Sequence, residues 1–218
     1  MNNTNIKSVA IIVAHPDDEI LWAGGTILSN TQWKCFIICL SRKNDKDRST
    51  KFYKVLEILH AKGIMGDLDD SPNQKPLYGV DVEESILDLL PKKSFDLVIS
   101  HNPTGEYTKH LRHEEISKAV IMLWNKGKII TNQLWTFAYE DGNKAYFPKA
   151  IDDASYFETL PNEILDKKYK LITEIYGFEL NSWEAQTTPK SEAFWIFHKP
   201  KEAIEKLNKN LNESIGTL

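Results

Sequence analysis

Three apolar runs of strand length, separated by segments with helical periodicity, constrain the fold of this chain more than any other feature. The runs are SVAIIVAH at 8–15, WKCFIICLS at 33–41 and FDLVIS at 95–100. Runs that are apolar throughout are typical of strands that helices cover on both faces of a parallel sheet. The sequence therefore predicts an α/β fold of the Rossmann-like, doubly wound kind, with a mainly parallel sheet and helices on both faces.

The intervals between these runs repeat apolar residues at helical spacing. The first such segment predicts a helix that begins after Asp47 and ends at Gly63, the second is stopped by Pro91, and the third ends near Gly127. Further elements are expected later in the chain: strands at 133–141 and 192–199, a helix over 165–176, and a peripheral helix in the tail at about 200–218. Because we find no repeat, low-complexity tract or linker, we expect one domain over residues 1–218.

Composition excludes several classes of partner. The 218 residues include 27 basic and 31 acidic side chains, a formal net charge of −4, which gives no electrostatic reason to expect nucleic acid or an anionic membrane as partner. Cys35 and Cys39 lie on one expected strand, too far apart to form a disulfide, so we expect free thiols. The first residues lack a signal-peptide pattern and no apolar stretch is long enough to span a bilayer. We expect a cytoplasmic protein without a membrane span, and the sequence specifies no oligomeric state.

A histidine and three acidic residues follow the first apolar run. His15, Asp17, Asp18 and Glu19 fall at the strand end, the place where doubly wound sheets bind ligands. No glycine precedes Gly24 in this turn, and the carboxylates would repel a pyrophosphate, so a dinucleotide site is disfavoured. A helix cap, worth about 1 kcal/mol, accounts for one aspartate. It explains neither the histidine nor the second aspartate.

Imidazole and carboxylate together indicate a metal site. A catalytic zinc uses three protein ligands and keeps one position open. Further histidines follow the run at 95–100, where His110 and His113 are three residues apart and share one face of a helical turn. Parallel strands bring both loops to the same edge of the sheet. Of the other histidines, His60 is expected on the surface, His198 is either structural or peripheral, and His101 is a weaker candidate for contact with substrate or metal.

The chain resembles a known family in these and other segments. They are AHPDDE, a following GG and GEYTKHLRHEEI, supported by RSTKFYKVLEILHAKG, GDLDDSPN, KYKLITEIYG and EAFWI. Together they resemble the PIG-L/LmbE-like zinc-dependent N-acetylglucosaminyl deacetylases. The resemblance implies a single deacetylase domain that uses Zn²⁺ or another divalent transition metal. It further implies an amide hydrolase that removes an N-acetyl or other N-acyl group from a small-molecule amino sugar or GlcNAc-containing conjugate.

The resemblance also implies a role for individual residues. By position, the metal ligands are His15, Asp18 and His113; the general base that activates water is Asp17; the histidine that stabilises or protonates the reacting centre is His110; and the substrate-side residues are Arg48, Asp70 and Tyr107. This assignment agrees with the strand-end cluster described from the residues themselves.

One departure from the family pattern lies in the second motif. The family motif reads His-x-Asp-His, whereas this chain has HLRH, with Arg112 in the place of the acid. We expect arginine there to disfavour a protonated His110 unless its side chain points away. Two alternatives therefore stay open beside the hydrolase: a metal-binding but non-catalytic α/β carbohydrate-binding module, and a structural protein whose acidic turn is only a cap.

Overall fold

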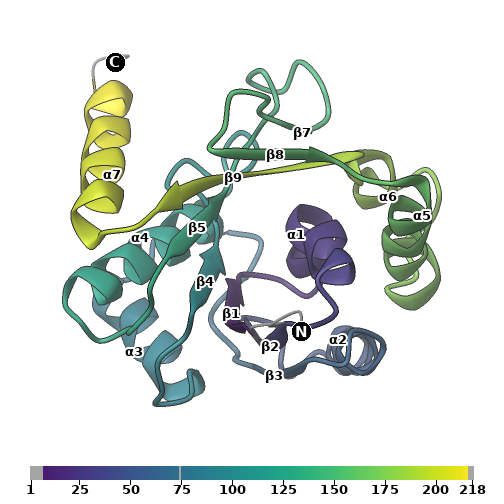
Figure 1. The fold of residues 1–218 in the computed structure, drawn as a ribbon, viewed down its shortest axis with the longest axis horizontal. Helices are drawn as coiled ribbons and strands as arrows, with labels where there is room; N and C mark the ends of the chain where they lie inside the picture. Colours follow the sequence, from purple (N-terminus) through teal and green to yellow (C-terminus); the bar gives the residue numbers. More distant parts are fainter. Residues whose placement is uncertain (1–6, 74, 216–218) are drawn as a thin grey trace, which may run out of the picture.

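The computed structural model describes residues 7–73 and 75–215 and has one seven-stranded sheet as its centre (Figure 1). The sheet strands in chain order are β1 Ser8–Val13, β2 Lys34–Cys39, β3 Lys62–Met65, β4 Leu97–Ser100, β5 Leu134–Phe137, β8 Tyr156–Thr159 and β9 Ser191–Phe197. A separate short hairpin pairs β6 Tyr139–Glu140 with β7 Lys149–Ala150. The helices are α1 Asp18–Ser29, α2 Lys46–Ile58, α3 Gly79–Leu89, α4 Leu111–Asn125, α5 Asn162–Lys170, the π-helical turn η1 Leu171–Ile175, α6 Trp183–Thr187 and α7 Pro200–Ile215.

The strand order of the sheet is β3-β2-β1-β4-β5-β9-β8. The pairs from β3 through β5 are parallel, and β9 and β8 join antiparallel at one edge. From β1 the chain builds outward through β2 and β3 on one side, and through β4 and β5 on the other. The order therefore reverses between β1 and β4, and the carboxyl ends of these two strands form the usual ligand site of such a sheet.

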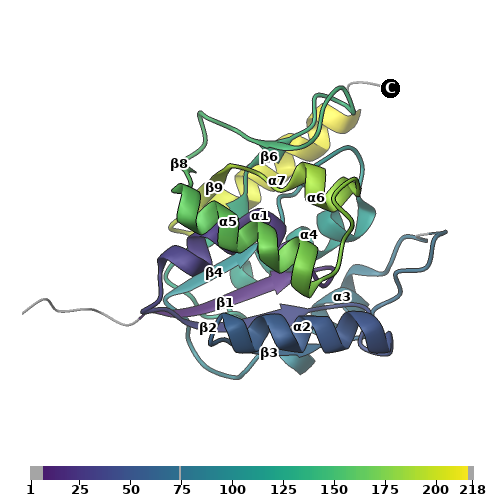
Figure 2. The ribbon, with the colours of Figure 1, turned by 90° about the vertical axis from the view of Figure 1, so that its right-hand side faces the viewer.

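Helices cover both faces of the sheet, as the apolar runs predict. Alternate residues of β1 belong to two separate cores: Val9, Ile11 and Val13 pack on the side of α1, α2 and η1, and the intervening residues pack on the side of α3, α4 and α7. Figure 2, viewed onto the first face, shows α2 and α5 in front of the sheet. The α/β prediction with a mainly parallel sheet is confirmed.

Several predicted boundaries differ from the structure. The first helix after β2 ends at Ile58 rather than Gly63, because residues 62–65 form the edge strand β3, a short run that the sequence analysis assigned to the helix end. The expected strand at 133–141 is divided between β5 and β6, and the expected helix at 165–176 ends in the π-helical turn. The tail helix is present to Ile215, and the end of that prediction, 216–218, lies outside the described residues.

A buried ion pair fastens α1 and α5 to the antiparallel edge of the sheet. The Lys168 ammonium lies 2.7 Å from the Glu192 carboxylate, and both side chains are fully buried. Glu192 also accepts hydrogen bonds from the backbone N–H groups of Gly25 and Thr26, both at 2.7 Å. A Cβ at Gly25 would lie 2.3 Å from a Leu160 methyl carbon, so only glycine fits here without a shift of the leucine.

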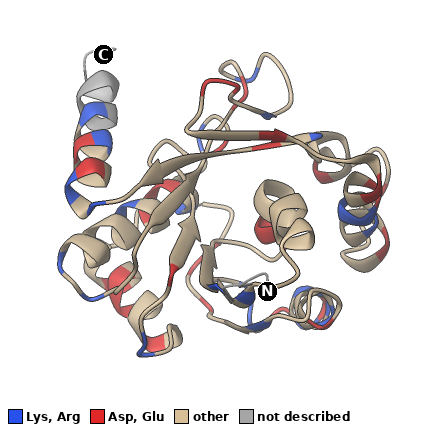
Figure 3. Cartoon of the chain, viewed as in Figure 1, with Lys and Arg blue, Asp and Glu red and all other residues tan. Residues whose placement is uncertain are grey.

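Surface charge is mixed, as Figure 3 shows for α2 and α5, where both signs of charge occur on the same helix. Cys35 and Cys39 are buried and free, as predicted. Within the described ranges, no helix combines the length and the apolar character that crossing a bilayer requires.

Candidate metal centre

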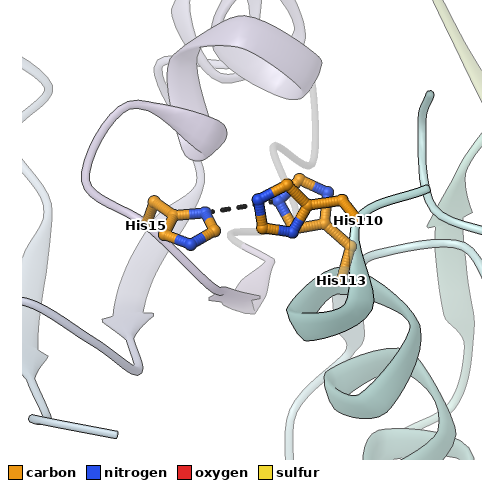
Figure 4. Close-up of side chains that lie close together, drawn as sticks. All are labelled: His15, His110 and His113. Atoms are coloured by element: carbon orange, nitrogen blue, oxygen red, sulfur yellow. Dashed lines mark hydrogen bonds between the residues drawn. The ribbon is translucent and has the colours of Figure 1, made fainter. Parts of the chain in front are cut away.

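The predicted site residues converge where the strand order reverses. His15 and Asp18 follow β1, and His110 and His113 lie at the start of α4, in the segment that follows β4. Figure 4 shows the imidazoles of His15, His110 and His113 directed toward one another from these two segments. The prediction that the two loops meet at one edge of the sheet is therefore confirmed.

The acidic turn before α1 is not a helix cap. Asp17 occupies the N-cap position, but its side chain makes no capping hydrogen bond. Its backbone has φ 124°, a conformation that costs a non-glycine residue free energy and that clusters at functional sites. Instead, the Asp17 carboxylate accepts a hydrogen bond from Arg48 Nη2 at 2.8 Å, and one oxygen of Asp18 faces the histidines. Capping by the Asp17 side chain therefore does not account for the acidic turn.

Three atoms from three residues form a small triangle. His15 Nδ1 lies 3.1 Å from Asp18 Oδ2 and 3.3 Å from His113 Nε2, and the remaining edge, from His113 Nε2 to Asp18 Oδ2, is 3.4 Å. Ligand atoms about 2.0–2.2 Å from a tetrahedral zinc lie about 3.3–3.6 Å from one another. The triangle thus has close to the dimensions of one face of a zinc coordination tetrahedron, so these residues fit the metal.

The other nitrogen of His15 is held by a carboxylate. His15 Nε2 lies 3.1 Å from Asp70 Oδ1, and the second Asp70 oxygen pairs with Arg42 Nη2 at 2.7 Å. When Nε2 carries a hydrogen that it donates to Asp70, the lone pair of Nδ1 faces the triangle. This carboxylate–imidazole arrangement is the usual outer support of a metal-binding histidine.

His113 is oriented by a buried relay of two side chains. His101 Nε2 accepts the Ala14 backbone N–H at 2.9 Å, so His101 carries its hydrogen on Nδ1 and donates it to Glu106 Oε2, also at 2.9 Å. The same Glu106 oxygen lies 2.5 Å from His113 Nδ1 and accepts that hydrogen. The His113 Nε2 atom is therefore left as the ligand atom, directed at the triangle. All three relay side chains are fully buried.

This hydrogen-bond pattern argues against one candidate ligand set. The side chains of Asp18, His101 and His113 form one group whose ligand atoms lie within 4.8 Å of one another, and His15, His110 and His113 form a second. His101 is excluded as a ligand because both of its nitrogens are already used within the protein. Its predicted contact with metal or substrate is not present in the structure, since His101 is 0% exposed and acts through Glu106.

His110 lies beside the triangle without a hydrogen-bond partner at one nitrogen. Its ring stacks on His113 with the centroids 4.1 Å apart and meets the His15 ring edge-on at 4.7 Å. Its Nδ1 atom is buried, with no partner among the described residues. Burial lowers the pKa of His110 to about 3, and the His113 and His15 rings add to this effect. A bound group can therefore use the neutral imidazole as a hydrogen-bonding partner.

The triangle favours positive charge. Burial opposes protonation of His113, but the Asp18 and Glu106 carboxylates outweigh it and raise the pKa of His113 to about 10. In the same way, Asp18 raises the pKa of His15 to about 8 against the effect of burial. A cation bound among these atoms would take the place of the imidazole protons.

Asp17 lies at the edge of the centre and is fixed by Arg48. The guanidinium bonds both the Asp17 carboxylate and the Pro16 carbonyl, the latter at 2.6 Å, and it lies over the rings of Tyr176 and Phe178. Burial raises the pKa of Asp17 to about 7, and Arg48 limits the rise. A carboxyl group with a pKa near neutrality is suited to proton transfer.

Arg112 points away from His110. Its Nε donates to the Asp69 carbonyl at 2.5 Å, Nη2 donates to the Lys75 carbonyl at 2.9 Å, and Nη1 pairs with Glu115 at 2.5 Å. The guanidinium therefore holds the loop between β3 and α3, which extends from the carboxyl edge of the sheet in Figure 2. The Arg112 side chain thus points away from His110, which is the condition that the sequence analysis set for leaving His110 undisturbed.

A cavity of about 480 Å³ opens over the centre. Seven of the eight predicted site residues line it, the exception being the fully buried His113. Arg48 and Asp70, which the resemblance places on the substrate side, have partners within the protein, Asp17 and His15 respectively. The Tyr107 ring packs on His110, with the centroids 5.4 Å apart.

One buried residue of the centre, Glu106, has no role in the sequence analysis, and the contact that it makes with His101 could not be predicted there. Glu106 and His101 are five residues apart in a loop, and sequence spacing alone does not show that their side chains meet. The meeting depends on the reversal of the chain at Gly105, where φ is +71°. The feature of the sequence that could have drawn attention to Glu106 is its position, a few residues before His110 and His113 in the segment that follows β4.

Comparison with known proteins agrees with this geometry. The family model described as "PIG-L: GlcNAc-PI de-N-acetylase" matches residues 10–124, more than half of the chain and the whole of the metal centre. The chain belongs to the PIG-L family. A curated relative, "Uncharacterized protein L374" of Acanthamoeba polyphaga mimivirus, is 27% identical over 187 residues, which cover 78% of this chain and 79% of the relative.

Solved structures of similar fold include several deacetylases. N,N'-diacetylchitobiose deacetylase from Pyrococcus horikoshii superposes with a TM-score of 0.66 at 17% identity, covering 89% of this chain and 85% of its own. The zinc-inhibited form of teicoplanin deacetylase superposes with a TM-score of 0.63 at 13% identity, covering 88% of this chain and 98% of the deacetylase. The 4-carboxy-2-hydroxymuconate hydratase of Pseudomonas putida superposes with a TM-score of 0.54 at 17% identity, covering 87% of this chain and 95% of the hydratase. At these identities the likeness shows a shared fold, and the hydratase shows that this fold also occurs in a protein that is not a deacetylase.

Proposed function

We propose that this PIG-L family member is a zinc-dependent deacetylase that hydrolyses the N-acetyl group of an amino sugar or a GlcNAc-containing conjugate. The proposal treats residues 1–218 as one catalytic domain. Family membership and the cluster of histidine and carboxylate ligands support an amide hydrolase that uses a divalent metal. Zinc is proposed because two imidazoles and one carboxylate are a common ligand set of catalytic zinc.

The observation that carries the proposal is the triangle of His15 Nδ1, Asp18 Oδ2 and His113 Nε2, with edges of 3.1, 3.3 and 3.4 Å. We assign these three residues as the metal ligands. Three ligands on one face leave the cavity side open for water and substrate. When bound there, the metal supplies a Lewis acid and makes water more acidic.

Asp17 is the proposed general base. It lies next in sequence to Asp18, yet its carboxylate turns to Arg48 and to the cavity rather than to the triangle. It takes the proton of the attacking water and delivers it to the nitrogen of the departing amine, so that acetate and a free amine leave. Arg48 keeps the carboxylate oriented for both transfers.

His110 and Tyr107 are the proposed donors to the substrate carbonyl oxygen. His110 presents a buried nitrogen without a protein partner, and Tyr107 lines the cavity beside it. Donors fixed in place before reaction stabilise the negative charge that develops on this oxygen. The remaining substrate-side residues, Arg48 and Asp70, act mainly through Asp17 and His15 in this proposal.

Metal content and acetate release test the proposal together. The purified chain, loaded with zinc, should hold about one equivalent of metal by elemental analysis and release acetate from a panel of N-acetylated amino sugars. Asp17→Asn should keep the metal and lose turnover. Bound metal with no acetate released from any conjugate would instead favour the non-catalytic binding module, and the absence of stoichiometric metal after supplementation would contradict the metal site itself.

A further inference from the structure

The short helix α6 brings two side chains to the cavity from a segment outside the metal centre. Ser182 caps α6 by accepting a hydrogen bond from the Ala185 backbone N–H at 3.1 Å. The next two residues, Trp183 and Glu184, line the same cavity as the metal centre. Since neither contacts the ligand triangle, they are placed to contact the part of a substrate that lies away from the reacting amide.

Trp183 contributes a partly exposed aromatic ring to the lining of the cavity. Its side chain is 37% exposed, although it packs on Tyr107 with ring centroids 4.8 Å apart and on the buried Trp22 at 6.5 Å. Trp22 in turn donates its indole N–H to Asp18 at 3.0 Å. An aromatic wall therefore runs from a metal ligand to the cavity mouth, and its outermost ring is fixed and partly open. Such a ring is suited to pack against the C–H face of a pyranose.

Away from the metal centre, carboxylates outnumber guanidinium groups in the lining of the cavity. Arg48 pairs with Asp17 at 2.8 Å, and Arg42 pairs with Asp70 at 2.7 Å. These are the two arginines of the lining, and each is paired with a carboxylate of the same cavity. Glu184 adds a further negative charge at the mouth, and no ion pair joins it to another described residue.

We propose that Trp183 and Glu184 select an uncharged glycoside, with a sugar ring packed on Trp183 and its hydroxyl groups donating to Glu184, and that they exclude a substrate whose attached group carries phosphate. This inference rests on the proposed function and narrows it. The PIG-L family model is described as a GlcNAc-PI de-N-acetylase. The carboxylates that line the cavity of this chain disfavour a phosphate on the group attached to the sugar. Specificity here comes from repulsion of the wrong group as well as attraction of the right one.

A matched pair of substrates tests the charge selection. The zinc-loaded chain is assayed for acetate release from the methyl glycoside of N-acetylglucosamine and from N-acetylglucosamine 1-phosphate, which differ only in the attached group. We expect kcat/KM to be about fivefold or more higher for the methyl glycoside, the size of one unfavourable charge contact in a partly solvated cleft. Glu184→Gln should narrow this ratio by raising kcat/KM for the phosphate. Glu179→Gln, an exposed carboxylate of the preceding loop, should leave it unchanged.

Substitution of the tryptophan tests the stacking. Trp183→Ala should raise KM for the methyl glycoside several-fold with little change in kcat, and Trp183→Phe should retain most of the affinity. Leu180→Ala, which truncates a side chain 71% exposed and outside the cavity lining, is the matched control. Saturation-transfer NMR with the metal-free chain reads the same contact without turnover, because sugar ring protons should receive saturation from the wild type and from Trp183→Phe but not from Trp183→Ala.

The outcomes separate the inference from the proposed function. Acetate release from neither substrate counts against the deacetylase, and the NMR comparison then decides the stacking by itself. Equal or faster turnover of the phosphate overturns the inference while leaving the deacetylase intact. An unchanged NMR transfer in Trp183→Ala overturns it as well.

Discussion

Replacement of Glu106 by glutamine should weaken zinc binding through His113, although residue 106 touches no metal. One oxygen of Glu106 accepts hydrogen bonds from His113 and His101, and the other accepts the Asn102 backbone N–H at 2.9 Å. A glutamine amide has only one accepting oxygen. If that oxygen points toward the histidines, the glutamine NH₂ group faces the Asn102 N–H, which loses its acceptor. In the opposite orientation the NH₂ group faces the N–H groups of both imidazoles, and both lose their acceptor.

The magnitude follows from this count. Each buried donor left without a partner costs about 1–3 kcal/mol, so one to two lost partners should destabilise the fold by about 1–6 kcal/mol. Loss of the carboxylate that orients a ligand histidine lowers metal affinity by about 10–100-fold. The zinc dissociation constant should therefore rise by that factor, which corresponds to about 1.4 kcal/mol for each tenfold step.

The assay must separate lost orientation from lost stability. Zinc affinity is measured by competition with a chelating dye, and stability by urea unfolding of the metal-free chain. The control is Ile86→Ala, which removes a fully buried side chain of α3 that lies outside the cavity lining, at a comparable cost of about 2–5 kcal/mol. We expect the control to keep its zinc affinity within about twofold of the wild type. A Glu106→Gln chain that binds zinc as tightly as the wild type would refute the assignment of Glu106 as the residue that orients His113.

Three further predictions concern the base, the metal and the buried ion pair. Asp17→Asn should keep its zinc and lose about 10²–10⁴-fold in turnover, the usual contribution of a general base, so full activity in an acetate assay would remove Asp17 from that role. Chelation should lower the melting temperature by about 5–10 °C relative to protein with free zinc at about a hundredfold its dissociation constant, and a calorimetric scan with no difference would argue against a metal bound to the folded state. Lys168→Met should cost about 3–5 kcal/mol in urea unfolding because it leaves Glu192 buried and unpaired, whereas the exposed Lys167→Met should have little effect, and equal stability of the two variants would contradict this.

The layered fold follows from the sequence where burial is uniform along an element. The run at 8–15 contains β1, which is covered on both faces, and uniform apolarity is the pattern that such burial requires. The edge strand β3 has only Met65 fully buried and is followed by a turn rather than a helix. Its four residues carry too little periodicity to separate it from the end of α2.

The sequence is enough to nominate the three residues of the triangle as candidate metal ligands, but it does not show which side chains orient them. His15, Asp18 and His113 are of metal-binding type and lie just beyond strand ends that a parallel sheet brings together. Glu106 and Asp70 act on those ligands through side-chain directions that depend on loop conformation. Asp70 reaches His15 across 55 residues, at 3.1 Å, from a loop whose sequence has no regular period. Position along the chain does not determine such contacts.

Arg112, which stands where the family motif has an acid, contacts the loop that carries Asp70 instead of contacting His110. An acid at this position was expected to act on His110, but the guanidinium turns to the loop between β3 and α3 and binds the carbonyls of Asp69 and Lys75. The residue after Asp69 is Asp70, which orients His15. Arg112 therefore stabilises one metal ligand through the backbone of that loop, while Glu106 orients the other through the relay. Both histidines of the triangle are thus oriented by carboxylates that lie outside the HLRH motif, so the geometry of the triangle does not depend on an acid within that motif.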